Sequence, residues 1–114
     1  MGAKQKLKGF HAQLILTLEE RLHDTGNYSE IEKGVSYLTR DACGEIDLYA
    51  VRGNRVLVFE IKSSDCRANR KKAEKQLKRA ATNYHLFHHK DCILFYAYWT
   101  DYREGEYGLE RVCF

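Results

Sequence analysis

The sequence predicts a single α/β domain, with a mixed central β-sheet flanked by helices in the order αβββαβ. Two stretches repeat apolar residues at helical spacing, and they enclose a group of runs rich in β-branched and aromatic residues. A further apolar run follows the second helical stretch. A chain of 114 residues can bury one core, so we expect one domain spanning residues 1–114.

The first expected helix runs from Lys6 to His23. Its apolar residues share one helical face, and the turn-forming residues HDTGN end this helical pattern. Residues 31–38 alternate loosely, as a strand does. The apolar face of the helix consists of Leu7, Leu14, Ile15, Leu18 and Leu22.

Two strands follow, GEIDLYAV at 44–51 and RVLVFEIKS at 55–63, separated by the pair Gly53-Asn54. That pair suits a tight hairpin turn between two antiparallel strands. Such a turn fixes which residues lie opposite each other along the hairpin.

The second expected helix covers residues 66–87, and the next strand is CILFYAYW at 92–99. The tail to Phe114 contains tyrosine and glycine and is expected to add an edge strand. The apolar residues of this helix recur at helical spacing, and they are Ala73, Leu77, Ala80, Ala81 and Tyr84.

The hairpin turn predicts that Asp47 lies opposite Glu60 and that Glu45 lies opposite Lys62. Opposed side chains have Cβ atoms roughly 4.5–5.5 Å apart, so two carboxylates there repel unless something neutralises them. A divalent cation does so, and oxygen ligands suit Mg²⁺ or Mn²⁺. Lys62 would then lie beside the metal-bound water. The alternative is a solvated face with a Glu45–Lys62 salt bridge.

The motif GEIDL, a hairpin and the motif FEIKSS follow one another between a first helix and a basic second helix. This arrangement resembles the PD-(D/E)XK nuclease superfamily over roughly residues 6–99. Within it, the chain is most similar to the small archaeal Holliday junction resolvases. The resemblance implies a restriction-endonuclease-like core. It also implies metal-binding carboxylates at Asp47 and Glu60, a metal-binding carbonyl at Ile61 and a catalytic Lys62.

The first helix departs from the resolvase pattern, which has a glutamate early in this helix. Here His11 lies on the apolar stripe, Glu19 lies at its border and Glu20 points away. A histidine at this place resembles RecB-type exonucleases and the viral cap-snatching RNA endonucleases, in which it binds metal. A nitrogen ligand favours manganese over magnesium. The alternative is a hydrogen-bonded core histidine.

The second helix is strongly basic, which predicts contact with a phosphate backbone, although a solvated helix face looks similar. Gln76 resembles the glutamine that follows ExK in this superfamily, where it either holds a phosphate or supports Lys62. Ser63 either binds phosphate or caps the strand end. The expected nucleic-acid-binding residues are Ser63, Arg67, Arg70, Lys71, Lys72, Lys75, Gln76 and Arg79.

Other site types find little support in the sequence. The four cysteines lie more than 20 residues apart, so neither a zinc pair nor an iron–sulfur cluster is expected. His85, His88 and His89 lack a clear fourth ligand for zinc. The longest apolar run is too short to cross a membrane and no signal peptide is evident, so we expect a cytoplasmic, intracellular protein that does not bind membranes. The net charge of +3 indicates a slight bias toward anionic partners.

Together these observations predict a metal-dependent endonuclease that hydrolyses phosphodiester bonds in DNA, including branched or junction DNA, as a homodimer with Mg²⁺ or Mn²⁺. One alternative is a single-strand DNA exonuclease or an RNA endonuclease of the histidine-containing type, with RNA as the partner in the latter case. Another is a DNA-binding module without catalysis.

Overall fold

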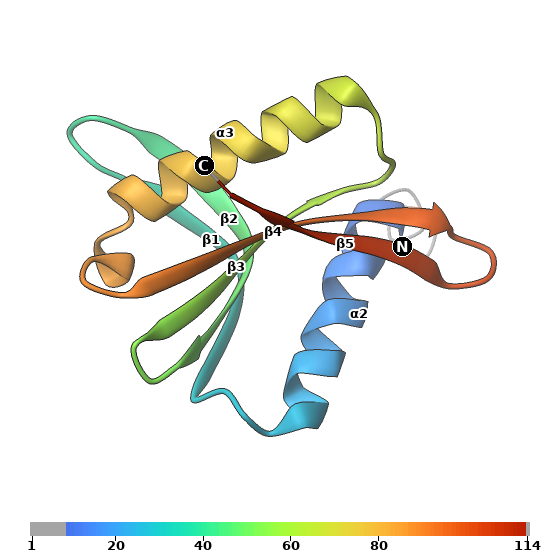
Figure 1. Cartoon of the computed structure of the whole chain (residues 1–114), viewed down its shortest axis with the longest axis horizontal. Coiled ribbons are helices and arrows are strands. Elements are labelled where there is room, and N and C mark those ends of the chain that lie inside the picture. The colour runs from blue at the N-terminus through green and yellow to red at the C-terminus, as the bar shows by residue number, and fades with distance from the viewer. Residues whose placement is uncertain (1–8, 114) are drawn as a thin grey trace, which may run out of the picture.

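The computed structural model describes residues 9–113, in which two long helices pack on a five-stranded mixed sheet (Figure 1). The strands lie in chain order, and each neighbouring pair is antiparallel except β3 and β4, which are parallel and joined by helix α3. The predicted fold class is therefore confirmed. The elements are α2 (Gly9–Thr25), β1 (Glu30–Leu38), β2 (Cys43–Arg52), β3 (Arg55–Lys62), α3 (Arg67–Asn83), the 3₁₀ turn η1 (His85–Phe87), β4 (Asp91–Asp101) and β5 (Glu106–Val112).

The β2–β3 hairpin has the predicted turn and the predicted register. Gly53 adopts a φ of 58°, the left-handed region that glycine enters without strain, and Arg52 pairs with Arg55. The pairing continues without a bulge to Leu48 opposite Phe59. The sequence-based register is thus confirmed along this length.

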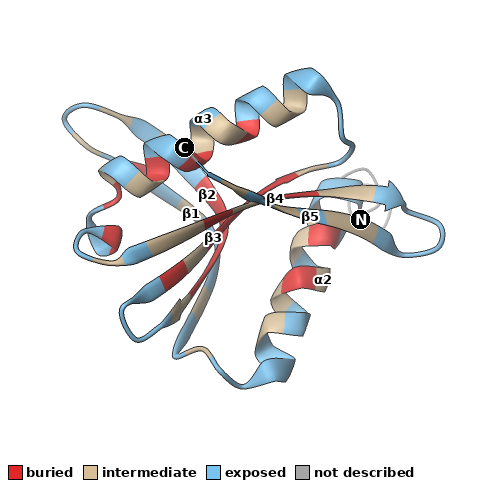
Figure 2. Cartoon of the chain, in the orientation of Figure 1, coloured by how far each residue is buried: buried red, intermediate tan, exposed pale blue. Residues whose placement is uncertain are grey.

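The two helices cover the two faces of the sheet, and each face has its own core. Leu14 and Leu18 of α2 pack with Phe59 and other apolar residues of the sheet, whereas Leu77 of α3 packs with Val58 and its neighbours. Successive residues of a strand point to opposite faces, so β3 supplies both cores from adjacent positions. Figure 2 shows the buried residues concentrated along the central strands and on the sheet-facing sides of the helices.

The second helix ends earlier than predicted, at Asn83 instead of residue 87. Tyr84 is extended, and its backbone N–H still donates to the Ala80 carbonyl before the chain turns into η1. This break lets the Tyr84 ring stay in the core, with its centroid 5.8 Å from that of Tyr37 and 4.9 Å from that of Phe87.

The remaining elements match their predictions closely. The predicted edge strand is β5, which pairs antiparallel with β4. The first helix is seen from Gly9 to Thr25, and its predicted start at residues 6–8 lies outside the described residues. Among residues 9–113, no helix has the length and apolar character needed to cross a bilayer.

Candidate active site

The backbone pairing of β2 with β3 ends one residue pair before Asp47 and Glu60. Leu48 and Phe59 are its last pair, and β2 then continues beside β1, where Glu45 pairs with Ser36. Asp47 and Glu60 therefore lie where the two strands diverge. They are the two charged side chains that the described part of the chain buries, with only 7% and 5% of their surface exposed.

Where the two strands diverge, the Asp47 side chain replaces a backbone carbonyl as the acceptor for an N–H group of β3. In a continued ladder Ile61 would face residue 46 of β2, but its N–H donates instead to the Asp47 carboxylate at 2.9 Å. In an extended strand the N–H and C=O of one residue point to the same side. The Ile61 carbonyl is thus expected on the β2 side of β3, where a hydrogen bond between the Ile61 backbone and His11 helps to raise the pKa of the imidazole.

Lys62 approaches the acid pair, although not as the hairpin register predicted. Its Nζ lies 3.4 Å from Glu60 Oε2 and donates to Gln76 Oε1 of α3 at 2.9 Å. The predicted Glu45–Lys62 couple is wrong, because the ladder ends before these positions and Lys62 pairs with Tyr98 of β4. Glu45 is exposed, whereas the acid pair is buried, so the alternative of a solvated acidic face is wrong too.

The two carboxylates have opposite electrostatic environments. Burial and the neighbouring charge of Asp47 raise the pKa of Glu60 to about 8, against the smaller opposing effect of Lys62. Burial also acts to raise the pKa of Asp47, but the hydrogen bonds from His11 and from the Ile61 N–H outweigh it and leave that pKa below its ordinary value. These opposite shifts favour the ionised form of Asp47 and the protonated form of Glu60.

Helix α2 contributes His11 to this site. The His11 Nε2 lies 3.4 Å from Asp47 Oδ2, and the hydrogen bond to Asp47 raises the pKa of the imidazole. The His11 side chain is 47% exposed, so the alternative of a packed core histidine is wrong. Glu19 instead pairs with Lys33 of β1 at 2.8 Å, and Glu20 is exposed. His11 is therefore the predicted helix ligand that reaches the carboxylates.

The candidate metal ligands are of types that suit a divalent cation, although their side chains now bind one another. Within residues 9–113, His, Cys, Asp and Glu side chains form no group of three or more already arranged around a metal. Asp47 accepts from His11 and Ile61, and Glu60 contacts Lys62. Two carboxylates, one imidazole and one carbonyl are hard or borderline ligands that fit Mg²⁺ or Mn²⁺. Binding would require Glu60 to lose its proton and His11 to turn a lone pair toward the ion.

The residues predicted to bind nucleic acid divide into two groups. Gln76 supports Lys62, which is one of the two roles left open for it. The Arg70 guanidinium binds Glu110 and Asp65, and its contact with nucleic acid stays a prediction. The others are exposed on α3 or in the loop before it, and their contact with nucleic acid stays a prediction; they are Ser63, Arg67, Lys71, Lys72, Lys75 and Arg79.

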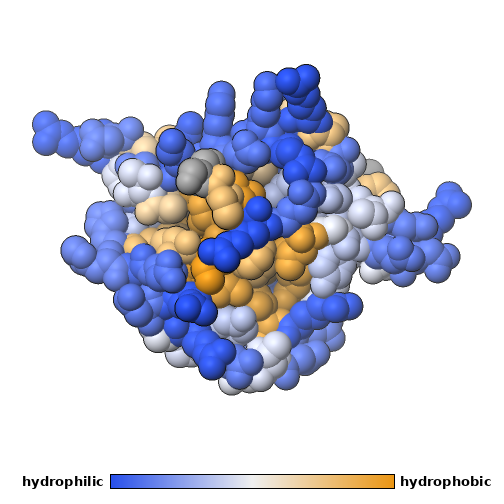
Figure 3. All heavy atoms as spheres, in the orientation of Figure 1, coloured by the Kyte–Doolittle hydropathy of each residue, from blue (hydrophilic) through white to orange (hydrophobic). Residues whose placement is uncertain are grey.

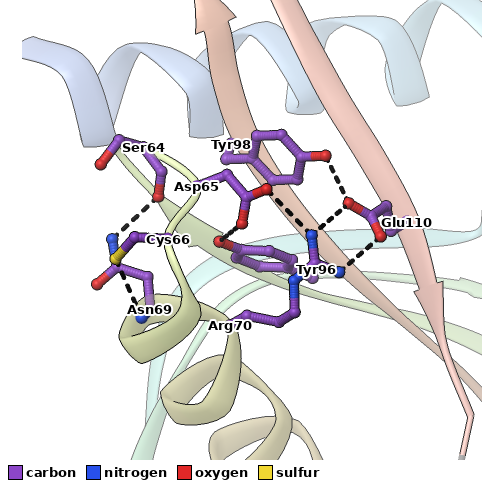
Figure 4. A network of polar contacts seen from close by, with 8 residues as sticks. All are labelled: Ser64, Asp65, Cys66, Asn69, Arg70, Tyr96, Tyr98 and Glu110. Atoms are coloured by element: carbon purple, nitrogen blue, oxygen red, sulfur yellow. Dashed lines mark hydrogen bonds and ion pairs between the residues drawn. The ribbon is translucent and has the colours of Figure 1, made fainter.

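The Arg70 contacts belong to a cluster that the sequence did not reveal (Figure 4). Arg70 binds both oxygens of Glu110, at 2.7 and 2.9 Å, and Asp65 Oδ2 at 3.0 Å. The Tyr96 hydroxyl donates to the other Asp65 oxygen at 3.0 Å, and the Tyr98 hydroxyl donates to Glu110. We call these five residues the Arg70 cluster. The alternation of Tyr96 and Tyr98 placed both on one face, but only the pairing of β4 with β5 places Glu110 beside them.

The Arg70 cluster borders the acid pair. In the β3–β4 ladder, Glu60 pairs with Tyr96 and Lys62 pairs with Tyr98, so these side chains lie beside one another on the α3 face of the sheet. Asn69 also donates to the Ser64 carbonyl at 2.9 Å. The loop that follows Lys62 is thus held by α3 and β4.

Comparison with known proteins identifies a family. Residues 18–112 match the family described as "Domain of unknown function (DUF4143)", a range that contains Asp47, Glu60 and Lys62 but not His11. No curated protein matches the chain. Because the match covers more than half of the sequence, the chain belongs to the DUF4143 family.

Proposed function

We propose that this protein is a metal-dependent nuclease of the PD-(D/E)XK type that hydrolyses phosphodiester bonds in DNA. The observation that carries the proposal is the buried Asp47–Glu60 pair at the divergence of β2 and β3, with the Lys62 amine 3.4 Å from Glu60. A fold gains nothing from placing two carboxylates side by side in its interior, because burial and mutual repulsion both oppose their ionisation. Such strained titratable groups are typical of functional sites.

Each residue has a role in the proposed hydrolysis. Asp47 and Glu60 would hold the cation together with the Ile61 carbonyl and His11. A bound divalent cation supplies a polarised water and stabilises charge on the phosphate. Lys62, oriented by Gln76, would position the attacking water and offset the negative charge that develops as the bond to the leaving oxygen breaks.

His11 favours a second candidate, a single-strand DNA exonuclease or an RNA endonuclease of the histidine-containing type. It reaches Asp47 from α2, whereas the two glutamates of that helix do not reach the site. Action on branched DNA as a homodimer stays a prediction, which sedimentation with and without a four-way junction would test.

The decisive experiment is a cleavage panel. Supercoiled, linear, single-stranded and four-way-junction DNA, and RNA, would be incubated with the protein in magnesium and in manganese. We expect cleavage of at least one DNA substrate, loss of cleavage in chelator, and a loss of at least about 100-fold in Lys62→Met.

A matched control is Lys33→Met, since Lys33 also pairs with a glutamate but lies away from the acid pair. This variant should cleave like the wild type. Binding of DNA without cleavage in either metal would instead favour the non-catalytic module.

A further inference from the structure

A cationic groove lies between α3 and the turn that joins β1 to β2. Its volume is about 370 Å³, and α3 lines it with Lys75, Lys78 and Arg79. The opposite wall includes Asp41 and Ala42. The residues that line the groove thus include three cations and one carboxylate, that of Asp41, a balance that favours an anion.

The turn that forms the second wall is internally hydrogen-bonded. The Thr39 N–H donates to the Ala42 carbonyl at 2.7 Å, and the Ala42 N–H donates to the Thr39 hydroxyl at 3.0 Å. Hydrogen bonds within the turn thus hold this wall of the groove.

Helix α3 connects the groove with the candidate active site, because it lines the groove and also carries Gln76. Arg79 lies three residues after Gln76, and residues at this spacing are neighbours on a helix surface. Gln76 in turn holds the Lys62 amine. Arg79 of the cationic wall thus lies one helical turn from the residue that orients Lys62.

A second connection runs through Tyr37 of β1. Its ring lies on Gly44, where an added Cβ would meet the Tyr37 hydroxyl oxygen at 2.7 Å, so a side chain at position 44 would displace the ring. Burial raises the pKa of Tyr37, and both Arg79 and Glu60 are close enough to act on its hydroxyl. Tyr37 is therefore within electrostatic reach of both Arg79 and Glu60.

On the β4 side of the site, the guanidinium of the Arg70 cluster is already paired. The Arg70 cluster covers the strands beyond Glu60, and its guanidinium is already bound by two carboxylates (Figure 4). Figure 3 shows a largely apolar area among the central strands on the viewed face of the molecule. An apolar area of this kind offers a phosphate backbone few partners.

We propose that the DNA backbone passes through this groove, with Lys75 and Arg79 binding phosphates that flank the bond to be cleaved. The inference rests on the proposed function and adds the path of the substrate across the protein. It makes β1, β2 and the second half of α3 the substrate-binding side, and it makes Asp41 an unfavourable charge along that path.

The test measures DNA binding in chelator, so that it does not depend on cleavage. Fluorescence anisotropy with a short labelled DNA duplex would compare Lys75→Gln and Arg79→Gln with Arg111→Gln, an exposed arginine on β5. Each groove variant should weaken binding and lower the slope of log affinity against log salt by about one. Arg111→Gln should change neither quantity.

Removal of the groove's negative charge provides a test with the opposite sign. Asp41→Asn should tighten binding, whereas Asp24→Asn, in the last turn of α2, should not. Loss of the fold cannot produce tighter binding, so this variant separates recognition from stability.

The outcomes distinguish the two proposals. If the protein cleaves DNA but the groove variants behave like their controls, the path is wrong and the nuclease stands. If the groove variants respond as expected but no metal supports cleavage, the groove stands as a DNA-binding surface and the nuclease is wrong. Absence of any DNA binding would overturn both.

Discussion

The Asp47 carboxylate accepts a hydrogen bond at 2.9 Å from the backbone N–H of Ile61, the residue that separates Glu60 from Lys62. This contact joins the two diverging strands through a side chain. The hydrogen bond favours the ionised form of Asp47 and lowers its pKa. Burial and the charge of Asp47 instead raise the pKa of Glu60.

The metal-free protein should become less stable as the pH rises from about 5 to about 8. Glu60 has an ordinary pKa of 4.5 and a folded-state pKa of about 8, so between these values only the unfolded chain releases the proton. The raised pKa of His11 acts in the same direction, since its stabilisation is present at low pH and is lost as the pH rises through that pKa. Thermal melts in chelator across this range measure the effect.

Glu60→Gln should flatten that pH dependence and raise the melting temperature at pH 8, because the amide stays neutral. Glu104→Gln, in the exposed β4–β5 turn, is the control and should melt like the wild type at each pH. A wild-type melting temperature that rises steadily from pH 5 to pH 8 would contradict the raised pKa of Glu60.

Gln76→Ala should lower cleavage about tenfold or more while the protein stays folded, because the Lys62 amine loses the acceptor that orients it. Single-turnover rates and a thermal melt would be measured together. Gln13→Ala removes another glutamine that accepts a side-chain hydrogen bond, from the Tyr102 hydroxyl, and serves as the control. Equal rates for the two variants would show that Lys62 needs no support from α3.

His11→Ala should reduce manganese affinity and leave the fold intact, since the imidazole is half exposed and its removal opens no core cavity. His11→Glu should restore binding with magnesium preferred, because a carboxylate oxygen is the harder ligand. Calorimetric titrations would compare both with His23→Ala in the last turn of α2. Unchanged affinity in His11→Ala would remove this residue from the metal site.

Glu110→Gln should lower the melting temperature more than Glu106→Gln on the same strand. Glu110 binds the Arg70 guanidinium and the Tyr98 hydroxyl, and these contacts lower the pKa of its carboxyl to about 2. The stabilisation should therefore be present near neutral pH and be lost as the pH falls below the ordinary carboxyl range. A double-mutant cycle with Arg70→Met should show coupling between the two residues.

The sequence predicted the order of the elements and the hairpin register, because both depend on local patterns. A two-residue turn at Gly53-Asn54 fixes the pairing of the residues beside it. That local rule also brings Asp47 and Glu60 together, so the acid pair is recognisable from the sequence alone.

Features that depend on distant strands could not be predicted. The divergence that buries Asp47 arises because β2 leaves β3 and continues along β1. Arg70 looked like its basic neighbours on α3, and only the position of β5 shows that it faces Glu110. The end of α3 at Asn83 depends on where the core accepts the Tyr84 ring.

The most direct test of the central claim is a manganese titration of the wild type, Asp47→Asn and Glu60→Gln. Calorimetry at pH 8 should detect binding to the wild type with release of protons, since Glu60 must ionise to become a ligand. Millimolar manganese should also raise the wild-type melting temperature, while both variants should lose most of the binding and of this increase. Identical melting of the wild type in manganese and in chelator, with no heat of binding, would contradict the assignment of Asp47 and Glu60 as a metal site.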